Sequence, residues 1–287
     1  MRLVSALICC GLMLASVPVV ADDTKTPPVA APDPVEVTAD ESLEWYQAQR
    51  LYVARGNAKA VRGTMTVEAD ILTAHERDKA ATAPSETAKD GAKSVAKTGN
   101  LDRMTAEGNV RITDPRQKVF GDRAVYDLDR KMAIVTGANL KYVTEHDVVT
   151  ARDSLEYYED QNLAVARGNA VADHDDRHVE GDVLTARFRQ TPSGQTELAE
   201  LRAEGNVTVV TGNDVSRGDR AVYDVQRNAA ILCGHVRVTR GNTQLTGDVA
   251  EVDFTKGESR LLNNGQGGRV RALLTPETKA SAKAKTP

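Results

Sequence analysis

The chain has 287 residues, of which only 4% are aromatic and 27% are charged, with a formal net charge of −4 at pH 7; its mean hydropathy is −0.41. So few aromatic rings argue against a thick globular core, and the slight negative charge excludes a broad basic face for nucleic acid. A composition rich in Ala, Gly and β-branched residues favours many short strands over a helical bundle.

The first segment has the features of an export signal. Arg2 supplies a positive charge, residues 3–20 are almost wholly apolar, and Ala21 precedes two aspartates, which is the order of a cleavable signal peptide. We therefore expect a signal peptide over residues 1–21, cleavage after Ala21 and export of the mature chain. A membrane anchor is the alternative, but the run is short for a span and no basic cluster follows it. Residues 22–34 are expected to be a Pro-rich linker.

Cysteine usage limits how the mature chain is stabilised. Cys9 and Cys10 lie within the expected signal, so Cys233 is the only cysteine left after cleavage. An intramolecular disulfide is then impossible even in an oxidising compartment. Stability must come from packing and from strand pairing.

Internal repetition is the most informative property of the sequence. Residues 42–46 and 54–58 return 112 positions later, at 154–158 and 166–170, and residues 121–127 return unchanged at 218–224, 97 positions later. The chain thus divides into two tandem halves, about 35–148 and 149–274. The difference between the offsets places an insertion in the first half, at about 78–98, where the Ala-, Lys-, Thr- and Ser-rich composition predicts a flexible surface loop.

Each half contains a shorter unit that opens with an aspartate and ends at a glycine, often followed by asparagine. The opening acids are Asp40, Asp70, Asp122, Asp153, Asp182, Asp219 and Asp248, and the glycines are Gly56, Gly108, Gly137, Gly168, Gly205 and Gly234. Gly-Asn adopts positive φ without strain, which suits either a hairpin turn or a bulge. About seven such repeats span the chain.

Period-2 alternation predicts half-buried strands in these repeats. Apolar and polar residues alternate at 110–112, 207–209 and 236–238. Helices are disfavoured because the units are short and glycine recurs. The predicted fold class is all-β, an elongated antiparallel assembly, although the run 132–135 is apolar on both faces and leaves its orientation open.

The strongest candidate for metal chemistry is the pair His174 and His178, with Asp175 and Asp176 between them. Imidazole and carboxylate groups can ligate zinc, but residues four apart on a strand are separated by about 13 Å. We expect a solvated turn and no metal site. No catalytic Ser/His/Asp or Cys/His set stands out and the acids recur with the repeat, so neither an enzyme nor a cofactor is expected. Residues 275–287 are expected to be a disordered, Lys-containing tail.

The ordered motifs resemble one known family, the OstA/LptA periplasmic lipopolysaccharide-transport proteins. The motifs that carry this resemblance are residues 37–43, 53–58, 67–70, 121–128, 134–137 and 267–274. The likeness covers about 35–274, with about three units more than a typical LptA. It implies an antiparallel β-jellyroll folded like a taco, whose apolar interior holds the acyl chains of lipid A. It also implies head-to-tail pairing with copies of the chain and with LptC-like and LptD-like proteins of the same fold, in a bridge from inner to outer membrane.

Small residues such as Ala124, Ala221 and Ala250 leave space between the walls of such a fold, where each buried methylene contributes about 0.8 kcal/mol. The predicted lipid-binding residues are Val35, Val37, Val110, Ile112, Tyr126, Leu128, Leu184, Val207, Val209, Tyr223, Val225, Val252 and Phe254. The alternative hypothesis is a structural β-solenoid or envelope scaffold without a lipid ligand. A soluble regulator of envelope assembly with the same fold is a third.

Overall fold

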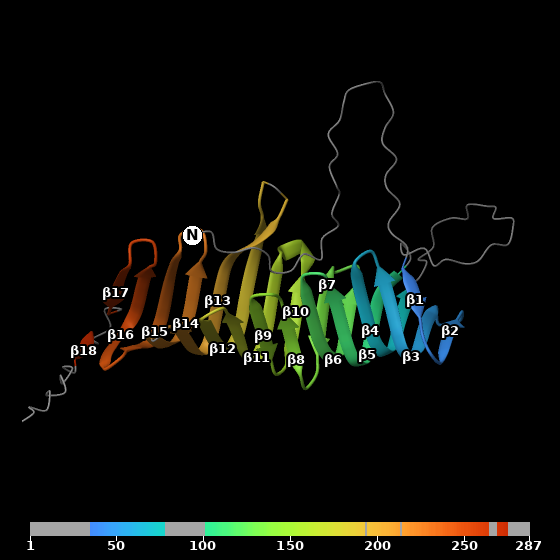
Figure 1. Cartoon of the computed structure of the whole chain (residues 1–287), viewed down its shortest axis with the longest axis horizontal. Helices are drawn as coiled ribbons and strands as arrows, with labels where there is room; N and C mark the ends of the chain where they lie inside the picture. Colours follow the sequence, from blue (N-terminus) through green and yellow to red (C-terminus); the bar gives the residue numbers. More distant parts are fainter. Residues whose placement is uncertain (1–34, 78–100, 193, 213, 264–268, 275–287) are drawn as a thin grey trace, which may run out of the picture. The chain divides into compact units, whose positions relative to one another are not determined.

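The computed structural model describes residues 35–77, 101–192, 194–212, 214–263 and 269–274. These residues form eighteen strands and one short 3₁₀ helix, Glu159–Gln161 (Figure 1). The predicted all-β, antiparallel fold is confirmed. The expected signal peptide 1–21, linker 22–34, insertion 78–98 and tail 275–287 lie outside the described residues. No helix in the described part is long and apolar enough to span a membrane.

The chain forms two compact units, which are described separately. Unit 1 comprises Met1–Arg167 and Arg187–Leu198, and unit 2 comprises Gly168–Ala186 and Ala199–Pro287. The division into sequence halves at 35–148 and 149–274 stays a prediction.

Ten strands belong wholly to unit 1. They are β1 (Glu36–Thr38), β2 (Ser42–Tyr46), β3 (Leu51–Arg62), β4 (Met65–Glu76), β5 (Leu101–Asp114), β6 (Gln117–Asp127), β7 (Met132–Thr136), β8 (Leu140–Val143), β9 (Asp147–Ala151) and β10 (Ser154–Tyr158). Three long strands contribute to both units: β11 (Leu163–His174), β12 (Arg177–Gln190) and β13 (Thr196–Thr211). Unit 2 also holds β14 (Asp214–Asp224), β15 (Ala229–Arg240), β16 (Thr243–Asp253), β17 (Glu258–Leu262) and β18 (Arg271–Leu273).

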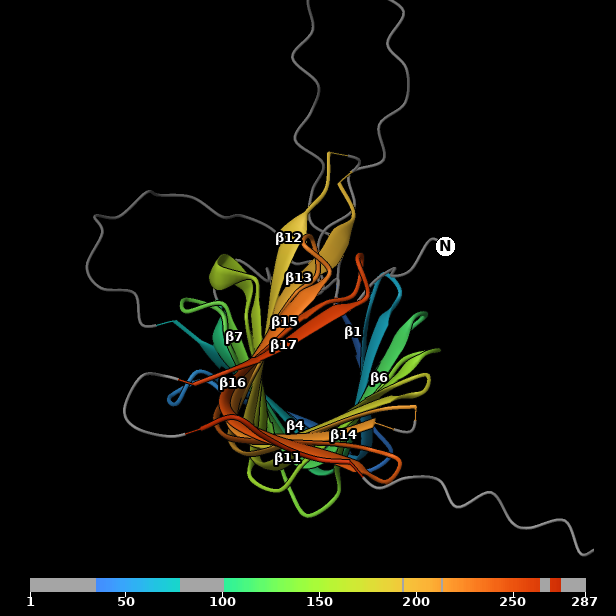
Figure 2. The same ribbon diagram turned by 90° about the vertical axis from the view of Figure 1, so that its left-hand side faces the viewer.

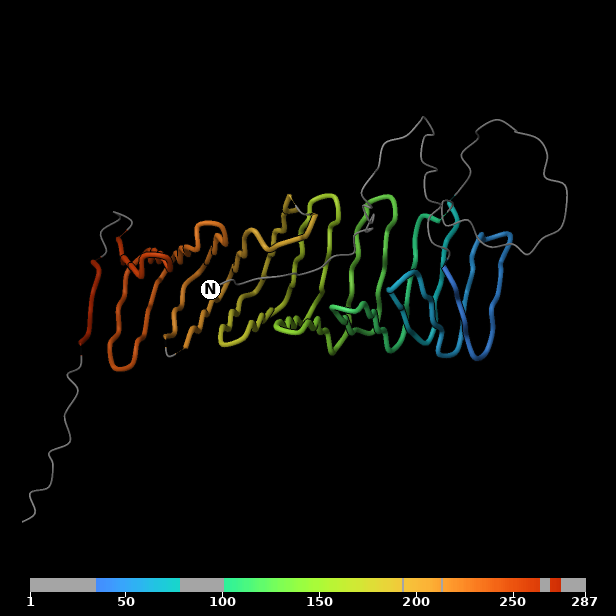
Figure 3. Tube along the Cα trace, turned by 45° about the horizontal axis from the view of Figure 1, so that its top comes forward, coloured from blue at the N-terminus to red at the C-terminus, as the bar shows by residue number. Residues whose placement is uncertain are grey.

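Each long strand contributes to two walls. On one side of its midpoint β3 pairs with β2, and on the other side it pairs with β1; β6 likewise pairs with β7 and with β8. In unit 2, β16 pairs with β17 and with β18 in the same way. The strands therefore bend from one wall into the other, as the end-on view in Figure 2 and the successive hairpins in Figure 3 show.

The bend is a bulge at the Gly-Asn pair, inside a strand and not at a hairpin turn. The registers of β5 and β13 shift between Glu107 and Val110 and between Glu204 and Val207. Gly108 has φ 77° and its neighbour Asn109 has φ 48°. Both residue types tolerate this left-handed conformation, which explains why Gly-Asn recurs with positive φ at 56–57, 168–169 and 205–206. In β15 His235, with φ 48°, takes the place of the asparagine after Gly234.

The opening aspartates lie against these bulges. Asn57 Nδ2 donates to Asp40 Oδ2 at 2.9 Å, and Asn206 Nδ2 donates to both carboxylate oxygens of Asp182 at 3.1 and 3.0 Å. A Cβ built on Gly205 would collide with the same Asp182 carboxylate. Asp40 and Asp182 thus each close the bulge of a neighbouring long strand.

Apolar packing is tightest where the two walls meet. In unit 1 this core consists of Ala69, Ala106, Val110, Ala124, Val135 and Leu140. Gly121 lies among them, and a Cβ built there would stand 2.5 Å from Val135 Cγ1. In unit 2, a Cβ built on Gly218 would stand 2.9 Å from Leu232. One built on Gly247 would stand 2.8 Å from Leu261. The bend is therefore filled by protein side chains.

Candidate functional site

The first wall of unit 1 is the one on the side of the bend where β2, β7 and β10 pair. Its inner face carries rows of apolar side chains that run across the strands. Residues directly opposite one another in neighbouring strands share a face. The row next to the bend is Leu72, Ala106, Ala124, Val135 and Leu155, and the row beyond it is Tyr52, Ala74, Met104, Tyr126, Ala133 and Tyr157. Each row thus contains both large and small side chains. The side chains of the row farther from the bend are half-buried.

The second wall of unit 1, on the side of the bend where β1, β8 and β9 pair, presents a similar row. Val67 lies opposite Ile112, Ile112 opposite Val119, and Val119 opposite Tyr142. Val67, Ile112 and Val119 are half-buried and pack against the core at the bend. The two walls of the unit therefore both present apolar side chains beyond that core.

Unit 2 repeats the arrangement. Tyr223 lies opposite Leu201 and Ala230 in one wall. In the other wall Ser216 lies opposite Val209 and Val238, and Val238 lies opposite Leu245. Tyr223 also contacts Phe254 edge-to-face, with ring centroids 5.9 Å apart. The apolar rows are a property of each unit by itself.

The predicted lipid-binding residues fall at three depths. Val110, Leu184 and Val207 are only 2%, 3% and 1% exposed. The half-buried members are Val35, Ile112, Tyr126, Leu128, Val209, Tyr223, Val225 and Val252. Val37 and Phe254 are 39% and 45% exposed. Their role in lipid binding stays a prediction, and the half-buried group is the one that a ligand could contact without displacing packed protein.

Sequence reasoning missed several residues of the same rows. Met104 and Ala133 flank Tyr126 on the inner face, and Tyr52 stacks on Trp45 with ring centroids 5.9 Å apart. Tyr157 was detectable, because it is the repeat counterpart of Trp45. No pattern in the sequence marks Met104, whose neighbour across the ladder depends on where the bulge falls.

Tyrosine hydroxyls of these rows bond to polar groups near the strand ends. Tyr52 donates to Glu76 at 2.9 Å, Tyr126 to Glu159 at 2.8 Å and Tyr223 to Asn228 Oδ1 at 2.9 Å. Burial, followed by the hydrogen bond and charge of Glu76, raises the pKa of Tyr52. An aromatic body in an apolar row with a bonded polar tip suits the boundary between an apolar interior and water.

The outer face carries a hydrogen-bond cluster that the repeat duplicates. Glu156 accepts bonds from Ser154 at 2.8 Å, from Tyr158 at 2.8 Å and from Arg167 at 2.9 Å. Burial alone would raise the pKa of Glu156, but these three donors outweigh it and the pKa lies below its ordinary value. The cluster therefore holds a charged, strongly bonded carboxylate on the face opposite to the apolar rows.

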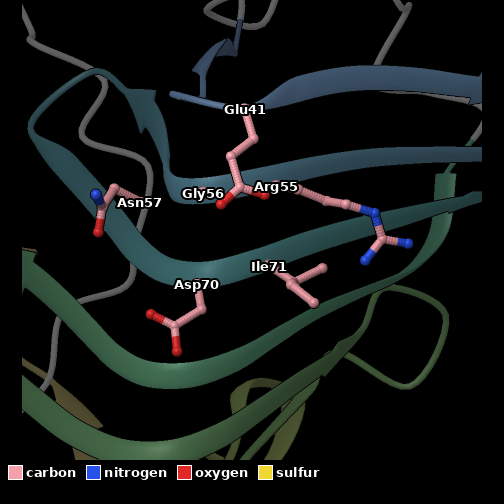
Figure 4. Close-up of a pocket in the computed structure, with 6 residues that line it drawn as sticks. All are labelled: Glu41, Arg55, Gly56, Asn57, Asp70 and Ile71. Carbon is pink, nitrogen blue, oxygen red and sulfur yellow. The ribbon is translucent and has the colours of Figure 1, made fainter.

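The first copy of this cluster is built on β2. Glu44 accepts from Ser42 at 2.7 Å, from Tyr46 at 2.6 Å and from Arg55 at 3.4 Å. Near it, Figure 4 shows a pocket lined by Glu41, Arg55, Gly56, Asn57, Asp70 and Ile71. Four of its six lining residues carry polar or charged side chains, so it differs in chemistry from the apolar rows.

The histidine cluster lies at the hairpin between β11 and β12, where Asp175 and Asp176 form an exposed turn, as expected. His178 is bonded through Nδ1 to Asp173 at 2.6 Å and through Nε2 to Glu180 at 3.0 Å. These two hydrogen bonds raise the pKa of His178. Within the described ranges, no group of three or more His, Cys, Asp or Glu side chains is placed to hold a metal ion.

Comparison with protein families decides the identity of this architecture. The family model described as "LptA/(LptD N-terminal domain) LPS transport protein" matches residues 36–153 and again residues 151–258. The chain belongs to this family. The match therefore assigns the chain to lipopolysaccharide transport as a class of function.

Among solved structures, the chain is similar to LptH, described as the LptA-homologous periplasmic component of the lipopolysaccharide transport device of Pseudomonas aeruginosa. The match has 18% sequence identity and a TM-score of 0.39, and it covers 45% of this chain and 95% of LptH. A search of curated proteins gives no significant match.

Proposed function

We propose that the chain is a non-enzymatic periplasmic protein that binds lipopolysaccharide and passes it along a head-to-tail bridge from the inner to the outer membrane. The acyl chains of lipid A lie between the two walls of each unit. The observation that carries this proposal is the pair of half-buried apolar rows beyond the packed bend, one on each wall of unit 1.

The energetics of the rows suit acyl chains. Because the bend is closed at Gly121 by Val135, the ligand contacts the next residues outward, represented by Ile112, Val119 and Tyr126. Burial of about ten methylenes between such rows contributes on the order of 8 kcal/mol before ordering costs. No catalytic group takes part, since neighbouring strands offer similar contacts and the lipid can slide from one to the next.

Charge supports apolar binding rather than ionic attraction. The chain has 41 acidic against 37 basic residues. A net negative protein attracts an anionic headgroup poorly. The sugar and phosphate groups therefore remain toward solvent, while the acyl chains supply the binding energy.

The terminal strands supply the bridge contacts. In the described part of the chain, β1 and β2 pair only with β3, and β17 and β18 pair only with β16. Strands at a sheet edge accept a further strand through backbone hydrogen bonds. Copies of this chain, and LptC-like and LptD-like proteins of the same fold, are the proposed partners.

The alternative of a β-solenoid scaffold is less well supported. Strands in the described ladders pair antiparallel, whereas successive coils of a parallel β-helix pair in parallel. The family match also concerns lipopolysaccharide transport.

Site-specific photo-crosslinking tests lipid binding. A photoreactive residue at position 112, on the inner face of β5, is compared with one at position 111, which is exposed on the opposite face. Crosslinking to lipopolysaccharide in cells is expected at 112 and not at 111. Equal labelling at both positions, or none at 112, would contradict the proposal.

A further inference from the structure

The second wall of unit 2, in which β16 pairs with β18, carries a row of arginines on its outer face. Each member of the row lies opposite the next in neighbouring strands, in the order Thr208, Arg217, Arg237, Thr246 and Arg271. The three arginines are exposed, whereas Val236, next to Arg237 in the strand, is only 1% exposed. The arginines therefore lie on the face opposite to the apolar interior of the unit.

Two of these arginines form a like-charge pair across the sheet. Arg217 of β14 lies directly opposite Arg237 of β15, and like charges in this position destabilise a sheet. At one end of the same two strands the charges are matched instead. Arg240 lies opposite Asp214 and donates from Nε to its carboxylate oxygens at 2.9 and 2.8 Å. The same ladder thus holds one complementary pair and one repulsive pair.

The chain supplies no counter-charge to the repulsive pair. Within the described ranges, neither Arg217 nor Arg237 forms an ion pair or a side-chain hydrogen bond. The nearest acid along β14 is Asp219, which is bonded to His235 at 2.8 Å. The neighbouring row on the side away from the bend is uncharged and consists of Val210, Val215, Thr239 and Gln244. The two guanidinium groups are therefore not used to hold the fold together and can bind a partner.

Unit 1 carries cations on the corresponding face of its own second wall. Arg111, Lys118 and Lys141 are exposed there. Glu68 lies opposite Arg111 but forms its ion pair with Lys59, at 3.2 Å. An excess of positive charge on this face thus occurs in both units, although the chain as a whole has a net charge of −4.

The outer face of the first wall of unit 1 differs, because its acids stand beside its cations. Arg123 forms an ion pair with Glu107 at 3.3 Å, and Arg167 forms one with Glu156 at 2.9 Å. The charges of that face are satisfied within the chain. The contrast between the two walls singles out the second wall as the surface for an anionic partner.

We infer that the outer row of β14 to β18 binds a glycan that bears carboxylates, which is the chemistry of the cell-wall polymer that a periplasmic bridge has to pass. The inference goes beyond the proposed function and takes from it only the location of the chain. Neighbouring strands lie about 4.8 Å apart, so the arginines from β14 to β18 span roughly 14 Å. That span suits successive anions of a linear polymer, and each guanidinium group can bind a carboxylate through two parallel hydrogen bonds.

The residues between the arginines favour a glycan over a membrane surface. Thr208 precedes Arg217 in the row, and Thr246 lies between the other two arginines. Threonine hydroxyls both donate and accept hydrogen bonds, which suits sugar hydroxyls and peptide amides. Segments that lie on an anionic bilayer insert Trp, Phe or Leu into it. On β14, β15 and β16, the arginine row and the uncharged row beside it contain none of these three residues.

Co-sedimentation with purified peptidoglycan sacculi tests the inference. The full chain is compared with the Arg217→Gln/Arg237→Gln variant. The matched control is Arg227→Gln/Arg240→Gln, which removes the same charge from the same unit but from arginines that already pair with an aspartate. Sacculi with amidated carboxylates and vesicles of phosphatidylglycerol are the other two probes.

We expect at least about tenfold weaker binding to sacculi for Arg217→Gln/Arg237→Gln and a change below about twofold for the control. The full chain should not pellet with amidated sacculi. The melting temperature of Arg217→Gln/Arg237→Gln should be unchanged or higher, because a repulsive pair is removed. Equal loss in the two variants, no binding by the full chain, equal binding to amidated sacculi, or stronger binding to the vesicles than to the sacculi overturns the inference.

The lipid site is tested separately on the same variants, by photo-crosslinking of lipopolysaccharide at position 112. Labelling is expected to be unchanged in Arg217→Gln/Arg237→Gln, because the two arginines lie on the face opposite to the apolar rows. Lipid labelling without binding to sacculi removes the inference alone. Binding to sacculi without lipid labelling removes the proposed function alone.

Discussion

Asn109 donates from its side-chain nitrogen to both carboxylate oxygens of Asp70, at 3.1 and 3.0 Å, across the bend between the two walls of unit 1. Asp70 belongs to β4 and Asn109 to β5. The pair therefore ties one long strand to the bulge of the next. The same contact at Asp182 and Asn206 in unit 2 makes it a repeated element of the fold.

Loss of this contact is expected to destabilise the chain. Asp70→Ala removes two hydrogen bonds to a charged group and should cost about 1–2 kcal/mol, seen as a lower urea midpoint. Glu68→Ala is the control, because Glu68 forms an exposed ion pair with Lys59 at 3.2 Å, which is worth less than about 1 kcal/mol. Equal midpoints for the two variants would show that the Asp70 contact carries no stability.

Added volume at the bend should also be harmful. Gly121→Ala brings a methyl group 2.5 Å from Val135 Cγ1, whereas Gly181→Ala meets its nearest atom at an ordinary 3.4 Å. Overpacking of this kind costs about 1–3 kcal/mol. We expect a lower melting temperature for Gly121→Ala and little change for Gly181→Ala. A melting temperature unaffected by Gly121→Ala would contradict tight closure of the bend.

Lipid retention should depend on the half-buried aromatic row. Tyr126→Asp places a charge among Met104 and Ala133 and is expected to lower co-purifying lipopolysaccharide, by mass spectrometry, at least about tenfold. Tyr126→Phe is the control, since it keeps the ring and loses only the hydrogen bond to Glu159. The β circular-dichroism signal should persist in both. Full retention by Tyr126→Asp would remove this residue from the lipid site.

His178 should make stability depend on pH. Hydrogen bonds to Asp173, and next to Glu180, raise its pKa in the folded chain, so the protonated form is stabilised by folding. Its contribution is complete below the unfolded value of about 6.5 and is lost as pH rises through the higher folded value.

The measurement is urea unfolding of the chain and of His178→Gln on both sides of that window. The difference between the two proteins should be larger at low pH and, for a partly exposed group, below about 1 kcal/mol. A difference that grows with rising pH would show that the sign is wrong.

Local pattern predicted much of the fold. The alternation at 110–112 gave a strand with Val110 inward and Arg111 outward, and the structure has this orientation. Gly108-Asn109 marked a position of positive φ, but a hairpin turn and a bulge need the same conformation, so sequence could not separate them. That choice decides which residues lie opposite each other, and Met104 was missed for this reason.

The local sequence pattern also could not predict how deeply each apolar side chain is buried. Val110 and Ile112 occupy equivalent places in the alternation, yet Val110 is 2% exposed and Ile112 is half-buried. The difference arises because Val110 pairs with Gly121 at the bend, where the walls converge. The distance of a residue from the bend is set only when the two walls fold against each other. It distinguishes residues of the packed core from the half-buried residues proposed to contact a ligand.

The bulges have a mechanical consequence. Ladder pairing between β5 and β6 is already interrupted between Glu107 and Val110, so rotation of one wall about this line breaks no regular backbone bond. Resistance to this rotation comes instead from the Asp70–Asn109 contact and from the apolar side chains beside it. We therefore expect the two walls of unit 1 to move apart or together about the line of bulges while the strands remain paired.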